Sequence, residues 1–357
     1  MKMTNKIAIV TDTHLSVRND HENLMQYQNE FWANVFFPKL NQDGIKEIFH
    51  LGDFFDKRQF VTVKSLQNLR DNFLPLLDKY DVNMTLIVGN HDILYRNTIE
   101  YNSPENIFAN NSRIKVIVEP TEIYGILLLP WITKDSYSDT LAVINRTDCK
   151  FCFGHFEIAG FEMHKGQVAE SGMNSDLFDK FHKVLSGHFH TRSHKRNIYY
   201  VGSPFEMTWS DFNDPRGFHY FDTDSGNLEF IKNPESMFFK IEYFSKNGKV
   251  KAHWQPYKPD NISGKFLKII VVTKESQADL DEFVSDLYQQ NPSELQVYES
   301  KIDVNGVLVE FENSEKCQSN LDIIQDKIKV LEDLNKDDQI LLSNYISKIY
   351  NESSSQT

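Results

Sequence analysis

The stretch Met84-Thr85-Leu86-Ile87-Val88-Gly89-Asn90-His91-Asp92 indicates the fold of most of this chain. Its first five residues form an apolar run typical of a buried strand, and metal-binding side chains follow directly after a glycine. Four other segments repeat this arrangement of an apolar run followed by carboxylates or imidazoles. They are Asp12-Thr13-His14 after Ile7–Val10, Gly52-Asp53 after Ile48–Leu51, Gly154-His155 after Phe151–Phe153, and Gly187-His188-Phe189-His190 after Val184–Ser186.

These strand-like runs predict a metal centre, because open α/β sheets keep their sites at the carboxyl ends of parallel strands. Strands lying side by side would bring all the tips to one edge of a sheet, where they offer more donors than one ion needs. Oxygen and nitrogen donors without a thiolate suit Mn²⁺ or Fe, with Zn²⁺ as a further option. We therefore expect two ions, the first held by Asp12, His14 and His190, the second by Asn90, His155 and His188, with Asp53 bridging both.

Such a pair of ions predicts hydrolysis of a phosphate ester. Two divalent ions roughly 3.5–4 Å apart clamp a phosphate and lower the pKa of a bridging water. His91 is adjacent to a predicted ligand but surplus to the ligand count, so we expect it to protonate the leaving oxygen or to stabilise the transition state. Either Asp92 or Asp56 could orient its ring. Any single motif of this kind would be an ordinary turn, and only the full set carries the prediction.

The composition predicts an ordered globular protein. The chain has 357 residues, of which 40% are hydrophobic, including 27 Phe and 15 Tyr. Its net charge of −13 argues against general adhesion to nucleic acid or to an anionic membrane, although bound ions and local basic patches can still attract DNA. We see no signal peptide and no run of roughly 20 apolar residues, so we expect a cytoplasmic protein that does not contact a membrane.

The cysteines and the remaining histidines are expected to carry no special chemistry. Cys149 and Cys152 fall on a predicted strand, where a spacing of three sends side chains to opposite faces, so we expect plain thiols and no zinc or redox site. Surface positions or satisfied core positions are expected for six histidines outside the motifs, namely His50, His164, His182, His194, His219 and His253.

Residues 1–232 alternate short apolar runs with helical patterns, which is typical of a layered α/β domain. Apolar residues at spacings of three and four predict helices at Asn23–Leu40 and Val63–Tyr80. Two later runs, Ile198–Val201 and Gly217–Phe221, are predicted to be strands of a second sheet.

The segment Lys232–Ser236 predicts a domain boundary, and residues 237–312 predict a small α/β domain. Its elements are strands at Phe238–Phe244, Phe266–Val272, Leu295–Ile302 and Val307–Phe311, with a helix around Gln277–Gln290. Residues 313–357 are then a polar linker followed by two amphipathic helices, Asn320–Leu334 and Asp337–Tyr350. We expect part of their apolar surface, including Ile324, Ile328, Leu342 and Ile346, to receive a partner helix.

Basic residues follow two of the motifs and give a weaker signal. Both stretches would lie near the metal edge, where they could contact a phosphate backbone, although ordinary solvated loops would look the same. The candidate DNA contacts are Lys57, Arg58, Arg192, Lys195 and Arg196.

The motifs D-x-H, G-D, G-N-H-D, G-H and G-H-x-H, in this order, resemble the calcineurin-like metallophosphoesterase superfamily. Within it, Asp12–Leu15, Gly52–Asp56 and Tyr200–Pro204 are similar to segments of SbcD-type DNA-repair nucleases. Pro130-Trp131 and Asn213–Phe218 are similar to the recombination endonuclease subunits of T-even-type phages. The resemblance is strong over the first domain and extends to the rest only by architecture.

The resemblance implies a two-sheet α/β/β/α core, a small α/β cap domain and a C-terminal helical segment. It implies a manganese-dependent DNA exonuclease or endonuclease that acts at DNA ends in recombination, replication and double-strand-break repair. The implied partners are DNA, the coiled-coil root of an SbcC-type ABC ATPase docked on the C-terminal helices, and a second copy of the chain. If a phage encodes the protein, its compartment is the host bacterial cytoplasm.

Two positions depart from the family pattern. The first motif usually continues with Gly where this chain has Ser16, and cellular relatives often carry His where it has Asp56. Two other functions compete with the nuclease. A superfamily phosphatase acting on phosphoproteins or small phosphomonoesters is the main rival, although protein phosphatases of this type usually show G-N-H-E. A non-catalytic scaffold is the third, and the complete donor set argues against it.

Overall fold

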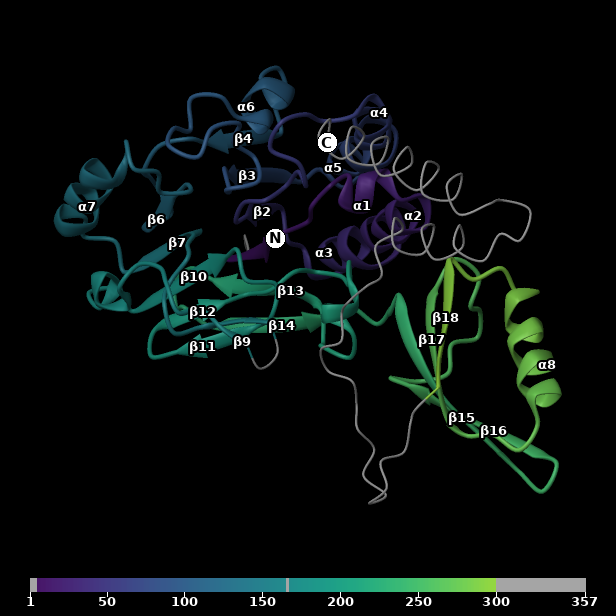
Figure 1. Ribbon diagram of the computed structural model, residues 1–357. Helices are drawn as coiled ribbons and strands as arrows, with labels where there is room; N and C mark the ends of the chain where they lie inside the picture. Colours follow the sequence, from purple (N-terminus) through teal and green to yellow (C-terminus); the bar gives the residue numbers. More distant parts are fainter. Residues whose placement is uncertain (1–4, 165–166, 300–357) are drawn as a thin grey trace, which may run out of the picture. The chain divides into compact units, whose positions relative to one another are not determined.

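The computed structural model describes residues 5–164 and 167–299 (Figure 1). Its first sheet contains three of the motif strands. The strand order is β14-β13-β1-β2-β3-β4, with β1 to β4 parallel and β13 antiparallel to β1. The bounds are β1 Lys6–Val10, β2 Glu47–His50, β3 Asn83–Ile87, β4 Ile114–Ile117, β13 Gly217–Asp222 and β14 Leu228–Lys232.

The second sheet contains the other two motif strands, β7 and β10. Its order is β11-β12-β10-β7-β6-β5, and the four central strands are parallel. A short separate hairpin joins β8 (Glu162–His164) to β9 (Gln167–Val168). The bounds of the second sheet are β5 Thr121–Ile123, β6 Ile126–Leu129, β7 Phe151–His155, β10 Lys183–Gly187, β11 Ser193–Lys195 and β12 Ile198–Tyr200.

The two sheets stack face to face, and helices cover their outer faces. Side chains alternate along each strand, so Ile7 and Ile9 of β1 point into the core shared with Phe151 and Phe153 of β7. Ala8, on the opposite face of β1, packs against the helices. The second sheet turns its outer face to α7 (Tyr137–Arg146), which lies apart from α1–α5 in Figure 1. This confirms the expected α/β/β/α layering.

Both predicted long helices are present, but each contains a π-helical segment. In each case the next helical segment begins with a proline at its first turn, Pro38 in α3 and Pro75 in α5. Proline has no N–H to donate to the carbonyl four residues earlier. The π-helical turn before each proline accommodates this missing hydrogen bond. The helical bounds are α1 Val17–Asp20, α2 Glu22–Glu30, η1 Phe31–Phe36, α3 Phe37–Asp43, α4 Val63–Asn68, η2 Leu69–Phe73, α5 Leu74–Tyr80, α6 Ser103–Phe108, η3 Ser175–Phe178 and η4 Trp209–Asp211.

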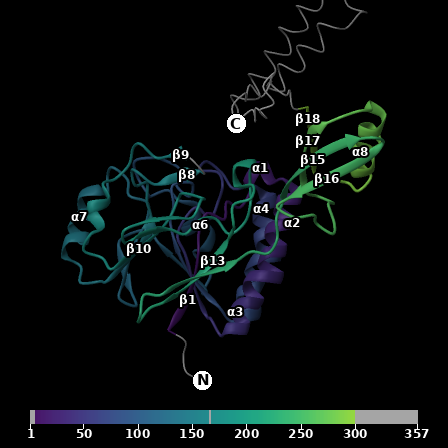
Figure 2. The same cartoon turned by 90° about the horizontal axis from the view of Figure 1, so that it is seen from below.

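Residues 238–299 form a four-stranded sheet, β16-β15-β17-β18, with α8 along one face (Figure 2). Its own apolar core joins strand residues such as Ile241 and Ile269 to Leu280 of α8. The sequence prediction omitted β16, whose exposed lysines mask the alternation of Val250, Ala252 and Trp254. The bounds are β15 Phe238–Lys246, β16 Lys249–Gln255, β17 Phe266–Thr273, α8 Gln277–Tyr288 and β18 Glu294–Glu299.

Three expectations were wrong. The motif strands do not share one sheet, because β7 and β10 pair with each other and stack on β1–β3. Gly217–Phe221 belongs to the first sheet, where β13 runs antiparallel to β1. Cys149 and Cys152 do not lie on opposite faces, because Cys149 precedes β7 and both pack against the same core; both are free thiols, as expected.

The predicted strand Val307–Phe311, the two C-terminal helices and the four candidate docking residues lie outside the described residues. Across the part of the chain that the structure describes, no helix is both long enough and apolar enough to cross a bilayer.

Candidate metal centre

The motifs meet where the carboxyl ends of the two stacked sheets come together. Asp12, Asp53 and Asn90 follow β1, β2 and β3 of the first sheet, whereas His155 ends β7 and His188 follows β10 of the second. Stacking the sheets therefore brings together residues that are far apart in the sequence. His155 Nδ1, for example, contacts the backbone carbonyl oxygen of Leu51, which lies 104 positions earlier.

The first cluster consists of Asp12, His14 and His190, which offer ligand atoms within 4.8 Å of one another. The Nε2 atoms of the two histidines are 3.1 Å apart. The other ring nitrogen of His14, Nδ1, lies 3.3 Å from the Asp56 carboxylate, which holds the ring with Nε2 turned to the cluster. This is the set that the sequence predicted for the first ion.

The second cluster joins Asn90, His155 and His188 to Asp53. The Asn90 Oδ1 atom lies 3.0 Å from His155 Nε2 and 2.8 Å from His188 Nδ1. His155 donates its Nδ1–H to the Leu51 carbonyl oxygen at 2.7 Å. This hydrogen bond fixes the orientation of the ring and leaves Nε2 as the nitrogen that can bind a metal ion. This is the set predicted for the second ion.

Asp53 stands between the clusters. Its Oδ1 accepts the backbone N–H of His91 at 2.7 Å. Its Oδ2 faces both groups, 3.2 Å from His155 Nε2 and 3.8 Å from His14 Nε2. One carboxylate oxygen is thus shared between the two sets of histidines, which is the geometry a bridging ligand needs.

The glycines of the motifs are explained by close approach of the strand ends. A Cβ atom on Gly89 would lie 2.3 Å from both the backbone nitrogen and Oδ1 of Asp53. A Cβ atom on Gly187 would lie 2.1 Å from Thr11 Oγ1. Both distances are far below van der Waals contact, so only glycine lets these strands end side by side.

Four of the metal-binding candidates have a left-handed backbone. The φ angles are 50° for Asp12, 42° for His14, 52° for Asp53 and 88° for His188. Non-glycine residues adopt this conformation at a cost of about 1–3 kcal/mol each, and such strain collects at functional sites. In each case the turn directs the side chain from the strand end into the cluster.

The buried charges shift one another's pKa values. Burial raises the pKa of Asp12 to about 6. Burial alone would lower the pKa of His14 and His155, but the neighbouring carboxylates raise both to about 9. Burial would raise the pKa of Asp53, yet His155 and His14 hold it well below its usual range. The carboxylates therefore require positive charge beside them, which protons on histidine supply here.

The donor set fits divalent ions. Two ligands that each lie about 2.1 Å from one ion are roughly 3.0–3.4 Å apart, depending on the angle between them. The donor atoms above are separated by 2.8–3.8 Å in the second cluster and its bridge, and by 3.1 Å between the histidines of the first. Small inward movements would complete two coordination shells of oxygen and nitrogen.

His91 borders both clusters and forms a third candidate group with His14 and Asp56, whose ligand atoms lie within 4.8 Å of one another. Its ring meets that of His14 edge to face, with centroids 4.9 Å apart. Its Nδ1 donates to the Asp56 carbonyl oxygen at 2.6 Å, so Nε2 is the nitrogen left to exchange a proton. Of the two predicted orienting residues, Asp56 contacts His91. The Asp92 carboxylate instead accepts the backbone N–H groups of Gly89 and Phe55, at 2.8 and 3.0 Å.

The predicted DNA contacts differ in their surroundings. Arg58 is partly buried, which lowers the pKa of its guanidinium, whereas the nearby Asp53 carboxylate acts to raise that pKa. Lys57 donates to Asn19 and lies over the Phe60 ring. The other three have internal partners: Arg192 covers the Phe230 ring, Lys195 donates to the Gly160 carbonyl, and Arg196 pairs with Asp176 and Asp179.

Two buried residues that contact the motif segments, Arg216 and His50, were not predicted from the sequence as part of the site. The Arg216 guanidinium is buried, donates to the His190 carbonyl and to Ser203, and pairs with Asp211 at 2.9 Å. His50 Nε2 contacts Thr13 Oγ1 at 2.9 Å, between the first motif residues. Arg216 belongs to the segment 213–218 singled out above, so that resemblance was the available signal.

The Ser16 departure also has a structural account. Ser16 has φ of 82°, the conformation in which glycine is the usual residue, and its hydroxyl contacts that of Ser65. The hydroxyl contact ties the first motif loop to α4.

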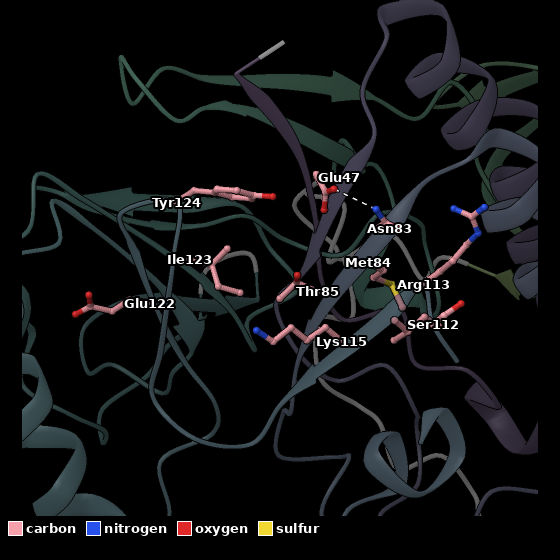
Figure 3. Close-up of a pocket in the computed structure, with 11 residues that line it drawn as sticks. Glu47, Asn83, Met84, Thr85, Ser112, Arg113, Lys115, Glu122, Ile123 and Tyr124 are labelled. Carbon is pink, nitrogen blue, oxygen red and sulfur yellow. Dashed lines mark hydrogen bonds between the residues drawn. The ribbon is translucent and has the colours of Figure 1, made fainter. Parts of the chain in front are cut away.

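A surface pocket of about 370 Å³ lies elsewhere. Figure 3 shows its lining residues, which include Glu47 and Asn83, the first residues of β2 and β3, and Tyr124. It is thus at the amino ends of strands whose carboxyl ends carry the clusters. The pocket contains none of the motif residues.

Comparison with known proteins identifies the family. Residues 5–192 match the calcineurin-like phosphoesterase family. The chain is 32% identical to exonuclease subunit 1 of Enterobacteria phage T4 over 97% of this chain and 98% of that protein. A solved dimetal phosphatase from Danio rerio is 8% identical over 64% of this chain and 95% of that chain, with a TM-score of 0.40. An archaeal phosphodiesterase is 14% identical over 64% and 99%, with a TM-score of 0.31. By its family match and its full-length relative, the chain belongs to the calcineurin-like phosphoesterases, which use divalent metal ions.

Proposed function

We propose that this protein is a Mn²⁺-dependent DNA nuclease that hydrolyses phosphodiester bonds at DNA ends during recombination, replication and double-strand-break repair. The observation that carries the DNA substrate is the similarity to phage T4 exonuclease subunit 1 over 97% of this chain. The converging donors support the chemistry, because they provide two adjacent cation sites beside a histidine with an available nitrogen.

Each part of the centre has a proposed role. Asp12, His14 and His190 would hold one ion, Asn90, His155 and His188 would hold the other, and Asp53 would be shared between them. Bound ions would supply charge neutralisation for a phosphate and acidify a water between them. His91 donates a proton to the leaving oxygen through Nε2, while the Asp56 carbonyl keeps its ring in place. Asp92 holds the backbone of the loops that carry these groups.

The substrate class is tested by one parallel assay. Purified protein is incubated with Mn²⁺ and linear duplex DNA, single-stranded circles or 4-nitrophenyl phosphate. We expect digestion of linear duplex, loss of activity with EDTA, and better restoration by Mn²⁺ than by Mg²⁺ or Zn²⁺. Single-stranded circles separate endonuclease from exonuclease action. Faster hydrolysis of the phosphomonoester than of any DNA would instead support the rival phosphatase.

We further propose that the protein works as one subunit of a complex. The T4 relative is named as a subunit, and the sequence resemblance indicates an SbcC-type ATPase and a second copy of the chain as partners. Docking through Ile324, Ile328, Leu342 and Ile346 remains a prediction from sequence. Truncation after Glu312 should abolish co-purification with the ATPase and leave Mn²⁺-dependent hydrolysis intact. Unchanged affinity of the truncated protein would refute the docking prediction.

A further inference from the structure

An exposed aromatic loop follows directly after the Gly89–Asp92 motif. It comprises residues 94–101, and we refer to it as the 94–101 loop. Tyr95 and Tyr101 are 53% and 52% exposed, and their rings meet edge to face with centroids 5.8 Å apart. The loop is closed by a hydrogen bond of 2.9 Å from the Leu94 N–H to the Tyr101 carbonyl. Both rings are therefore presented to solvent by an anchored turn that follows the Gly89–Asp92 motif in the chain.

The base of this loop is fixed on both sides. Ile93 is buried and forms a β-bridge with Asn102. The Asn102 side chain accepts the Glu105 N–H at 2.8 Å, which caps α6, and donates to the Ile99 carbonyl at 3.0 Å. The loop thus continues a motif at one end and begins a helix at the other. Fixed aromatic rings in solvent are typical of a binding surface, because exposing them gains nothing for folding.

Two arginines accompany these rings. Arg96 lies between the two tyrosines in sequence, and Arg58, which is partly buried, follows Asp53 of the second motif by five positions. The charge of Arg96 acts on Arg58. Two like charges therefore lie near each other on a chain whose net charge is −13. A local concentration of cations on an acidic protein favours an anionic ligand that reaches the metal centre.

A third exposed ring, that of Phe60, lies two positions after Arg58 in the sequence. Phe60 is 45% exposed, and the Lys57 ammonium lies 4.8 Å from its ring centroid. The segments that follow the second and third motifs thus each combine exposed rings with cations. This combination suits a strand whose phosphates and bases are both accessible.

We propose that the 94–101 loop binds unpaired nucleotides of a DNA strand entering the metal centre, with bases stacked on Tyr95 and Tyr101 and phosphates beside Arg58 and Arg96. This inference rests on the proposed nuclease function. Aromatic rings stack on every base, so the surface would not select a sequence. An intact duplex keeps its bases inside and offers the loop only phosphates. The protein therefore prefers frayed or single-stranded ends over fully paired ones.

The test compares two strands of equal length and charge. One is a phosphorothioate-linked oligothymidylate, which resists hydrolysis, and the other is an abasic strand with the same linkages. Affinity is measured by fluorescence anisotropy at fixed salt. Stacking of one or two bases should make the wild-type protein bind the thymidylate roughly 10- to 100-fold more tightly than the abasic strand.

The Tyr95→Ala/Tyr101→Ala double variant should lose this preference and keep its affinity for the abasic strand. Tyr95→Trp should retain the preference. Arg96→Ala should weaken both strands equally and reduce the salt dependence of binding. Tyr124→Ala is the matched control, since Tyr124 is 61% exposed and lines the pocket at the amino ends of the strands (Figure 3).

A base preference that survives in the double variant would overturn the inference. Equal loss of affinity for both strands would also overturn it, since the tyrosines would then only shape the loop. A variant that keeps the preference but no longer assembles with its ATPase would assign the loop to a protein partner. Failure of the wild-type protein to hydrolyse any DNA would instead refute the proposed function, so the two failures are distinguishable.

Discussion

The two ends of the same parallel strands have opposite properties. The carboxyl ends of β2 and β3 carry Asp53 and Asn90 in a buried cluster with left-handed backbone and glycines in close contact. The amino ends of these strands line a pocket of about 370 Å³, where Arg113 makes ion pairs of 2.6 and 3.0 Å with two largely exposed aspartates. In the described part of the chain this pocket is at one end and the converging donors are at the other.

The two ends also differ in what holds their side chains in place. At the amino ends, exposed ion pairs contribute little to stability and tolerate change. At the carboxyl ends, buried carboxylates need compensating charge, and the backbone accepts strain to bring them together. Substitutions matched in type between the two ends should therefore have very different effects.

The largest effect is expected for Asp53→Asn. A neutral amide bridges two ions poorly, so metal content should fall at both sites and DNA hydrolysis should drop by about 10³-fold or more. The control is Glu47→Gln at the amino end of the same strand, which should retain both ions and full activity. Metal content by mass spectrometry decides the matter, and two full sites in a folded Asp53→Asn protein would rule out the bridge.

His91→Asn should reduce turnover on the order of 10²-fold, the usual scale for losing a general acid. Metal content and DNA affinity should be unchanged, because we assign the two ions to the other clusters, although the His91 ring also forms a candidate group with His14 and Asp56. His182, which precedes β10 at its amino end, provides the control as His182→Asn. If His91→Asn loses metal, His91 is a ligand and the ligand set must be reassigned.

Gly89→Ala should lower the free energy of unfolding by about 2–3 kcal/mol, since the new methyl group would overlap the Asp53 backbone. The displaced Asp53 should also weaken metal binding. Gly125→Ala is the comparison: it has a φ of 72° but no atom within 4 Å of its Cβ position, so only backbone strain of about 1 kcal/mol applies. Urea unfolding with and without Mn²⁺ separates the two effects, and equal losses in both variants would contradict the steric account.

An effect that appears only as pH changes is expected at Glu206, a buried carboxylate away from both ends. It accepts the N–H groups of Met237 and Phe238 at 2.7 and 3.0 Å, and burial raises its pKa to about 7. The folded state therefore binds the proton more tightly than the unfolded state does. Its contribution to stability falls as pH rises from about 4.5 to about 7.

Glu206→Gln keeps an acceptor for both N–H groups and removes the charge. Between pH 5 and pH 8, the wild-type free energy of unfolding should fall by about 2–3 kcal/mol more than that of the variant. Denaturant unfolding at the two pH values, with Mn²⁺ present throughout, gives this difference. Parallel pH profiles would show that Glu206 stays ionised in the folded protein.

Much of the fold could be predicted because its signals are local. Continuous apolar runs predicted β1, β2 and β3, and the spacing of apolar residues predicted the two helical stretches without their π segments. The pairing of distant strands was not predictable in this way. Gly217–Phe221 looks the same in sequence whether β13 joins the first sheet or the second, and only pairing with β1 decides it.

The sequence by itself indicated the candidate donors of the centre, because a residue type carries its ligand chemistry and a glycine before it indicates a close approach. Their division into two ligand sets remains a prediction, although Asp12, His14 and His190 do lie together. Tertiary structure alone decided that Asp53 Oδ2 faces both groups, that the Asp56 carbonyl orients His91, and that Arg216 supports His190. These contacts depend on how two sheets stack, and stacking is set by packing over the whole core, which no single segment of sequence encodes.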